Sequence, residues 1–133
     1  MATTTATLTI SSADLTSNPL AITTSSTLYK AGTTIGLEQT TGLSKKVYAA
    51  AQTNATLINK DDYADNTHSR VYIRNSGSSS TDFFTIELGA SNIVLGRLYG
   101  GDFLFIPYEG EQDIDITSSA TNMELEFMVI NEG

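Results

Sequence analysis

Apolar and polar residues alternate in short runs along the second half of the chain, and the runs are separated by glycine, serine, asparagine or aspartate. Alternation with a period of two is typical of strands, because successive side chains of a strand point to opposite faces. The sequence shows no convincing helical periodicity. It predicts an all-β fold, a single antiparallel β-sandwich of jelly-roll type. The predicted strands lie at residues 71–74, 82–88, 93–98, 103–106, 113–117 and 123–130.

Turn-forming residues suggest how these strands follow one another. The glycines of residues 99–102 can adopt the positive φ of a tight turn, so we expect residues 93–98 to pair with residues 103–106 as a hairpin. The serine-rich loop at residues 75–80 predicts either a hairpin or a longer crossing. Residues 45–52 fit a short helix or a strand, and we favour the strand. Residues 59–66 are polar and indicate a loop.

The N-terminal residues are rich in threonine and serine. Such a run predicts an extended arm or an edge strand at residues 1–12, ahead of a β-sandwich domain at residues 13–133. An arm of this kind can add a strand to the exposed sheet edge of a neighbouring protein, where backbone hydrogen bonds supply affinity. The candidate contact residues on the arm are Thr3, Thr5, Thr7, Leu8 and Ile10.

The strand at residues 103–106 and the two residues after it are apolar on both faces. Phe103, Phe105 and Pro107 share one face of an extended chain, and the alternate residues, including Tyr108, share the other. Such a strand is either central and covered by a loop, or part of a contact with another subunit. Phe103, Phe105 and Tyr108 are therefore candidate interface residues.

The charge of the chain is unevenly distributed. Residues 1–100 hold seven acids and seven bases, whereas residues 101–133 hold eight acids and no base, which gives the net charge of −8. An acidic chain is a poor ligand for phosphates, so we expect no binding of nucleic acid. If residues 109–115 are extended, four acids face one side: Glu109, Glu111, Asp113 and Asp115. This acidic ledge is a solvated surface, a calcium site or a contact for a basic protein.

Catalytic chemistry has little support. The chain has no cysteine, and its single histidine, His68, lies in a polar segment without a Gly-x-Ser-x-Gly turn. The glycine-poor serine loop at residues 75–80 does not match a phosphate-binding loop. We therefore predict a protein that is not an enzyme and that needs no cofactor or metal. The absence of a long apolar run and of a secretory signal favours a soluble protein that folds in a cytoplasm, without a membrane contact.

Residues 70–130 resemble small β-sandwich structural proteins of tailed-phage virions. The segments that carry the resemblance are VYIRN at residues 71–75, GGDFLFIPY at residues 100–108 and MELEF at residues 123–127. The resemblance implies a head decoration or cement protein that is made in the host cytoplasm. It would bind the major capsid protein on the outer capsid surface, clamp neighbouring capsomers and self-associate, with a trimer favoured. The alternative is a tail, fibre or cell-surface module that binds a receptor or a glycan.

Overall fold

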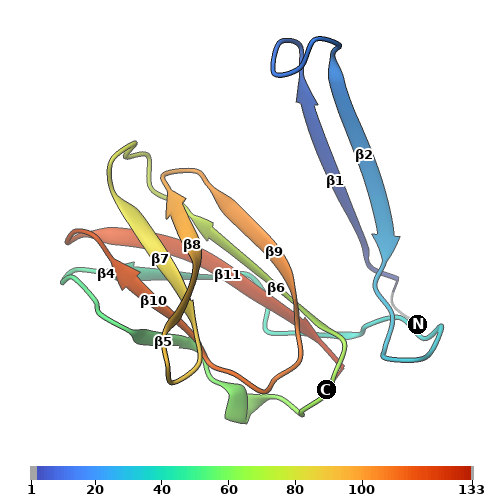
Figure 1. Ribbon diagram of the computed structural model, residues 1–133. Helices are drawn as coiled ribbons and strands as arrows, with labels where there is room; N and C mark the ends of the chain where they lie inside the picture. Colours follow the sequence, from blue (N-terminus) through green and yellow to red (C-terminus); the bar gives the residue numbers. More distant parts are fainter. Residues whose placement is uncertain (1–2, 133) are drawn as a thin grey trace. The chain divides into compact units, whose positions relative to one another are not determined.

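The computed structural model describes residues 3–132, and these residues form strands and one short 3-10 helix, η1 (Lys60–Asp62), without an α-helix (Figure 1). The predicted all-β class is thus confirmed, with antiparallel pairing throughout these residues. The strands are β1 (Thr5–Ser12), β2 (Leu20–Thr27), β3 (Gln39–Thr40), β4 (Ser44–Tyr48), β5 (Ala55–Ile58), β6 (Ser69–Asn75), β7 (Phe83–Leu88), β8 (Ile93–Tyr99), β9 (Phe103–Tyr108), β10 (Ile114–Ser118) and β11 (Met123–Asn131).

The chain divides into two compact units, Met1–Glu38 and Gln39–Gly133. The first unit contains a hairpin of β1 and β2, and the second contains the remaining strands, β3 to β11. The sequence predicted an arm or edge strand that ends at residue 12. In the structure the strand at these residues pairs with β2, a second strand that sequence analysis did not identify.

The hairpin has eight consecutive cross-strand pairs without a register shift, from Thr5 opposite Thr27 to Ser12 opposite Leu20. Because side chains alternate along both strands, the pairs sort the residues onto two different faces. One face carries seven hydroxyl side chains and one alanine, and the Thr7 and Ser25 hydroxyls are hydrogen-bonded across it at 2.9 Å. The other carries three hydroxyl residues, Ser12, Thr24 and Ser26, and five aliphatic residues, after which we call it the aliphatic face: Ala6, Leu8, Ile10, Leu20 and Ile22.

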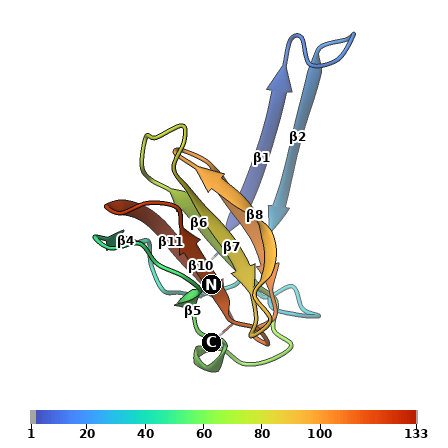
Figure 2. The ribbon, with the colours of Figure 1, turned by 60° about the vertical axis from the view of Figure 1, so that its left-hand side comes forward.

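The second unit contains two sheets. The strand order of one is β3-β11-β6-β9, with β4 also paired to β11, and the order of the other is β5-β10-β7-β8 (Figures 1 and 2). The pairings are nested along the chain: β7 pairs with β8, β6 with β9, β5 with β10, and β4 with β11. A long antiparallel ribbon, folded at the β7–β8 turn, therefore supplies both sheets.

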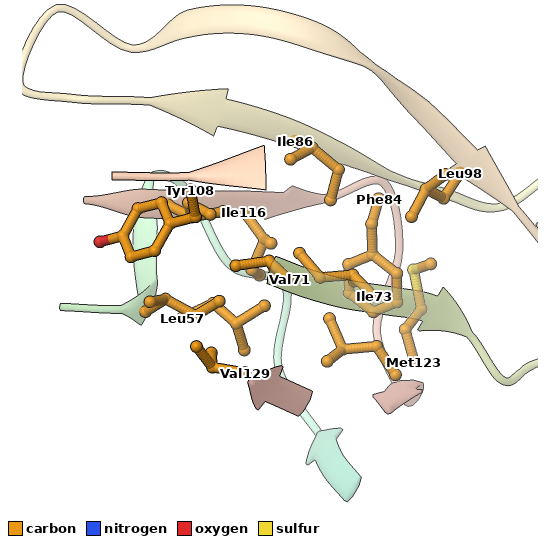
Figure 3. Packing of buried hydrophobic residues seen from close by; sticks show 13 residues of the cluster. Leu57, Val71, Ile73, Phe84, Ile86, Leu98, Tyr108, Ile116, Met123 and Val129 are labelled. Atoms are coloured by element: carbon orange, nitrogen blue, oxygen red, sulfur yellow. The ribbon is translucent and has the colours of Figure 1, made fainter. Parts of the chain in front are cut away.

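Both sheets contribute side chains to one hydrophobic cluster (Figure 3). In β6 the inward residues Val71 and Ile73 are fully buried, while the intervening Tyr72 is half-buried. Phe84 of β7 is also fully buried, and its ring lies 6.0 Å from that of Tyr48. Burying one side chain of this size contributes about 1.5–3 kcal/mol to folding, so this cluster is the main source of stability in the second unit.

The predicted hairpin between residues 93–98 and 103–106 is wrong. The strands at these positions, β8 and β9, belong to different sheets, and the turn between them crosses from one sheet to the other. The turn binds distant segments: Gly100 N donates to Ser79 O, and Gly101 N donates to Asn75 O. A Cβ on Gly100 would lie 2.5 Å from Ser79 O, so this glycine allows a close backbone approach.

The structure also shows what three further segments of this unit form, residues 45–52, 59–66 and 75–80. The ambiguous segment at residues 45–52 begins as a strand, β4, as favoured from the sequence. Residues 59–66 contain η1 within the predicted loop. The serine loop at residues 75–80 is the longer crossing, because β6 and β7 lie in different sheets. Asn75 anchors its start, since its side chain donates to Leu98 O at 2.9 Å and accepts from Gly77 N at 3.0 Å.

Candidate interaction surfaces

Several large apolar side chains are exposed on the edge strands β8 and β9 of the second unit. Among residues 3–132, β8 pairs only with β7, and β9 pairs only with β6, so each strand has one open side. An open strand side presents unpaired backbone groups to any neighbouring chain. We call the apolar residues of these strands that are 40% to 63% exposed the edge surface; they are Ile93, Val94, Leu95, Phe103 and Phe105.

Strand β9 has the two faces that its sequence predicts. Phe103 and Phe105 are exposed, and Leu104 and Ile106 are half-buried against the core. The structure places the third candidate, Tyr108, in the core, where its ring packs edge-on against Tyr63 at 5.8 Å. Its hydroxyl donates to Gln112 O at 2.8 Å. Burial, with a smaller contribution from Asp113, raises the pKa of Tyr108 to about 12. Tyr108 therefore packs into the core at the end of β9, and it is not part of the edge surface.

Strand β8 contributes a feature that sequence analysis missed. Ile86 pairs with Gly96 and Glu87 pairs with Val94, so the register shifts and Leu95 has no partner. This is a β-bulge, which bends an edge strand and exposes the extra residue. Three aliphatic residues in a row immediately before Gly96 are a possible signal for such a strand, because a strand with one buried face would alternate there.

The hairpin residues predicted to make contacts are divided between its two faces. Thr5 and Thr7 lie on the hydroxyl face and Thr3 precedes β1, whereas Leu8 and Ile10 lie on the aliphatic face. Leu8, Ile10 and Ile22 are each 43% to 45% exposed. Neither strand of the hairpin contains a charged residue. The predicted contact residues therefore do not form one surface, and only the aliphatic face carries large apolar side chains.

The acidic ledge is not present, because residues 109–113 are not extended. Gly110 has a φ of +81° and turns the chain between β9 and β10. Glu109 and Glu111 are exposed in this loop, and Asp113 Oδ1 accepts a hydrogen bond from Lys60 N at 2.9 Å. Asp115, the fourth predicted member, is buried in β10. The four carboxylates thus have three different environments and do not form a common surface.

Asp115 lies directly opposite Glu87 of β7, and both are buried, with 7% and 5% exposure. The Thr117 hydroxyl donates to Glu87 Oε1 at 2.8 Å. Among the described residues 3–132, Glu87 Oε2 and Asp115 Oδ1 have no hydrogen-bond partner. Like charges opposite each other on neighbouring strands reduce stability. Within residues 3–132 no group of three or more acidic, histidine or cysteine side chains is placed to hold a metal ion.

His68 is held against a cation. Its ring Nε2 is 2.5 Å from Nη2 of Arg70, and since a guanidinium can only donate, the histidine nitrogen accepts. Burial lowers the pKa of Arg70. An acceptor nitrogen that is already occupied by a guanidinium is not available to take a proton from a nucleophile. This arrangement provides no support for a catalytic role of His68.

A polar cleft of about 270 Å³ lies beside the crossing loop at residues 75–80. Its size is slightly below the usual range for small-molecule sites. Two of its lining side chains are already used by the loop: those of Asn75, as described above, and Ser79, whose Oγ accepts from Asp82 N at 3.0 Å. These two side chains shape the cleft by holding the loop in place, so the cleft is explained by the loop structure and gives no indication of a ligand.

Comparisons with protein-family models, curated proteins and solved structures find no match to this chain. In the part of the chain that the structure describes, no helix is long and apolar enough to cross a membrane. The described residues offer two exposed apolar surfaces for contacts, the edge surface of β8 and β9 and the aliphatic face of the hairpin.

Proposed function

We propose that this chain is a non-enzymatic structural protein of a tailed-phage virion, a decoration protein that binds the major capsid protein on the outer face of the shell. The single observation that carries the proposal is the edge surface, five large apolar side chains exposed on two strands with open edges. Exposed apolar groups at open strand edges are typical of surfaces that bind another protein. The resemblance of residues 70–130 to virion proteins supports a capsid protein as the partner.

We also infer that the second unit is a β-sandwich of jelly-roll type. The nested pairing of β4 with β11, β5 with β10, β6 with β9 and β7 with β8 supports this inference, because a jelly roll is an antiparallel ribbon wound into two four-stranded sheets. The hydrophobic cluster to which both sheets contribute also supports it. Jelly rolls occur in viral capsid proteins but also in lectins and enzymes, so the fold is compatible with the proposal and does not carry it.

The docking contact combines the edge surface with the charge of the second unit. Residues 39–133 hold 13 acids and six bases, a net charge of −7. Opposite charge on a partner raises the association rate and sets orientation, while desolvated aromatic residues supply most of the affinity. We expect Phe103 and Phe105 to be the main anchors on the shell, and the exposed acids to lie at the rim of the contact.

The test is cosedimentation of the purified chain with heads of the phage that encodes it, assembled without the chain. We expect saturable binding at a fixed ratio to the major capsid protein. Replacing both anchors, Phe103→Ser with Phe105→Ser, removes the two exposed aromatic side chains of β9 and should weaken binding roughly tenfold or more. Phe103 and Phe105 are exposed in the free chain, so the variant should fold, as checked by its far-ultraviolet circular dichroism.

The matched control is Val47→Ser, which also removes an exposed apolar side chain from an outer strand of the same sheet. Because β4 and β9 lie at different sides of that sheet, the control should bind as the parent does. Absence of the chain from the phage particle, equal binding by the double variant, or equal loss in the control would each reject the proposal.

A further inference from the structure

We propose that the β1–β2 hairpin is a self-association element, in which the aliphatic faces of two or more copies of the chain pack against one another. The proposed contact lies on the hairpin and does not require that the chain bind a capsid. It assigns the predicted self-association to a surface other than the edge surface.

The first step is that a two-stranded sheet has no layer of its own to cover an apolar face. Isolated two-stranded hairpins are marginally stable in water, and at least a third strand or a packed layer is needed for independent stability. Leu8, Ile10 and Ile22 remain 43% to 45% exposed on the aliphatic face, with Ile10 directly opposite Ile22 at its centre. Hydroxyl groups form hydrogen bonds with water, so the hydroxyl face needs no cover. One face of the hairpin therefore lacks a partner.

The second step is that charge favours a second copy as this partner. Residues 39–133 carry a net charge of −7, whereas residues 1–38 carry only Asp14, Glu38 and Lys30. Like-charge contacts between copies are unfavourable, so the second unit opposes self-association. The strands of the hairpin contain no charge and can approach their own copies without this penalty. A basic partner would instead be attracted to the acidic second unit.

The third step concerns the edges of the hairpin. Within residues 3–132, β1 and β2 pair only with each other, so both outer edges are open. Natural proteins protect open edges with lysine, proline or bulges. Neither strand contains lysine or proline, and their eight pairs include no register shift. The hairpin thus lacks the features that prevent pairing with further copies. We expect aliphatic faces to stack at about 10 Å, as packed sheets do, with room for edge pairing as well.

The experiment measures the mass of the intact full-length chain by native mass spectrometry and by sedimentation equilibrium. We expect the parent chain to be an oligomer. Leu8→Lys with Ile22→Lys places two charges on the aliphatic face and should weaken association roughly tenfold or more, giving a species of the single-chain mass of 14.2 kDa. Hydrogen exchange of the hairpin amides supplies a second readout: protected in the parent and unprotected in this variant.

The matched control is Thr7→Lys with Thr23→Lys, which adds the same charges at the same diagonal spacing on the hydroxyl face. It should keep the mass of the parent. Near-ultraviolet circular dichroism of the tyrosines reports whether the second unit stays folded in both variants. A parent chain that is a single copy at every concentration, an aliphatic-face variant that stays associated, or a control that dissociates equally would overturn the proposal.

The result is separable from the capsid-binding test. A single-copy parent that still binds phage heads would reject self-association through the hairpin and leave the decoration role intact. An oligomer that dissociates only when the aliphatic face is altered, but that binds no head, would support this inference and reject the decoration role.

Discussion

Apolar residues alternate with other residues in the β1 strand of the hairpin and in β6, yet these apolar residues are exposed in the hairpin and buried in β6. Val71 and Ile73 on the inward face of β6 are fully buried, whereas Leu8 and Ile10 on the aliphatic face are more than 40% exposed. The difference lies in what surrounds each strand. Strand β6 lies between β9 and β11 in a sheet whose core side is covered, whereas β1 pairs with β2 alone in the part of the chain that the structure describes. Alternation therefore specifies which face of a strand is apolar, but not what covers it.

The two regions also differ in charge. The hairpin strands have none, while the second unit holds nearly all of the net charge and even buries two opposed carboxylates, Glu87 and Asp115. A region with its own core can carry surplus charge and remain folded, because burial of apolar area supplies its stability. A region that must associate with copies of itself cannot carry much charge without repulsion. Core and charge thus distinguish the second unit, which has its own hydrophobic cluster, from the uncharged hairpin, for which we propose self-association.

The contrast in burial is tested most strongly at Phe84 and Leu8. Phe84→Ala removes a fully buried ring and should lower the free energy of unfolding of the second unit by about 3–5 kcal/mol. Leu8→Ala shortens an exposed side chain in the other unit and should change this free energy by less than about 0.5 kcal/mol. Urea denaturation followed by tyrosine circular dichroism measures both. Equal effects would mean that the two regions do not differ in stability as proposed.

The positions of most strands could be predicted because the alternation of buried and outward residues is local. The strands from β6 to β11 each overlap a predicted run, and β9 has the predicted faces. Their pairing could not be predicted from the same signal. The glycines of the β8–β9 turn suit a hairpin and a crossing equally, and the choice depends on Ser79 and Asn75, which bind the turn from distant segments.

The candidate surfaces were only partly predictable. Phe103 and Phe105 follow from the two apolar faces of β9, but the exposure of Ile93 to Leu95 depends on a bulge and on an edge position that tertiary pairing determines. Strand β2 was missed because threonine and serine weaken its alternation. The acidic ledge was predicted on the condition that residues 109–115 are extended, and the turn at Gly110 breaks that condition.

A second test of the buried region uses pH. The pKa of Tyr108 is raised to about 12, mainly by burial, from 10.0 for the ordinary side chain. Below pH 10 both the folded and the unfolded chain keep the proton, so the shift has no effect there. Between pH 10 and 12 the unfolded chain releases the proton while the folded chain keeps it, so the free energy of unfolding falls as pH rises. Two pKa units correspond to at most about 2.7 kcal/mol.

Tyr108→Phe should therefore make the pH dependence less steep between pH 10 and 12. At neutral pH it should cost about 1 kcal/mol, because the hydrogen bond to Gln112 O is lost. Burial also raises the pKa of Tyr48, Tyr63 and Tyr72, so some dependence will remain. Denaturation curves at several pH values give the slope. An unchanged slope in the variant would show that Tyr108 is not held in the core as described.

The smallest expected effect tests the difference in charge between the two units. If the buried carboxylates Glu87 and Asp115 lower the stability of the second unit, removing one of them should stabilise it. Glu87→Gln removes one of two opposed charges, keeps an oxygen for the Thr117 hydroxyl, and brings an amide opposite Asp115 Oδ1, which lacks a partner. The free energy of unfolding should rise by about 0.5–1 kcal/mol. Glu109→Gln makes the same change of charge in an exposed loop and should leave stability unaltered. A gain in both variants would attribute the effect to net charge, and a loss at Glu87 would mean that the pair is stabilising.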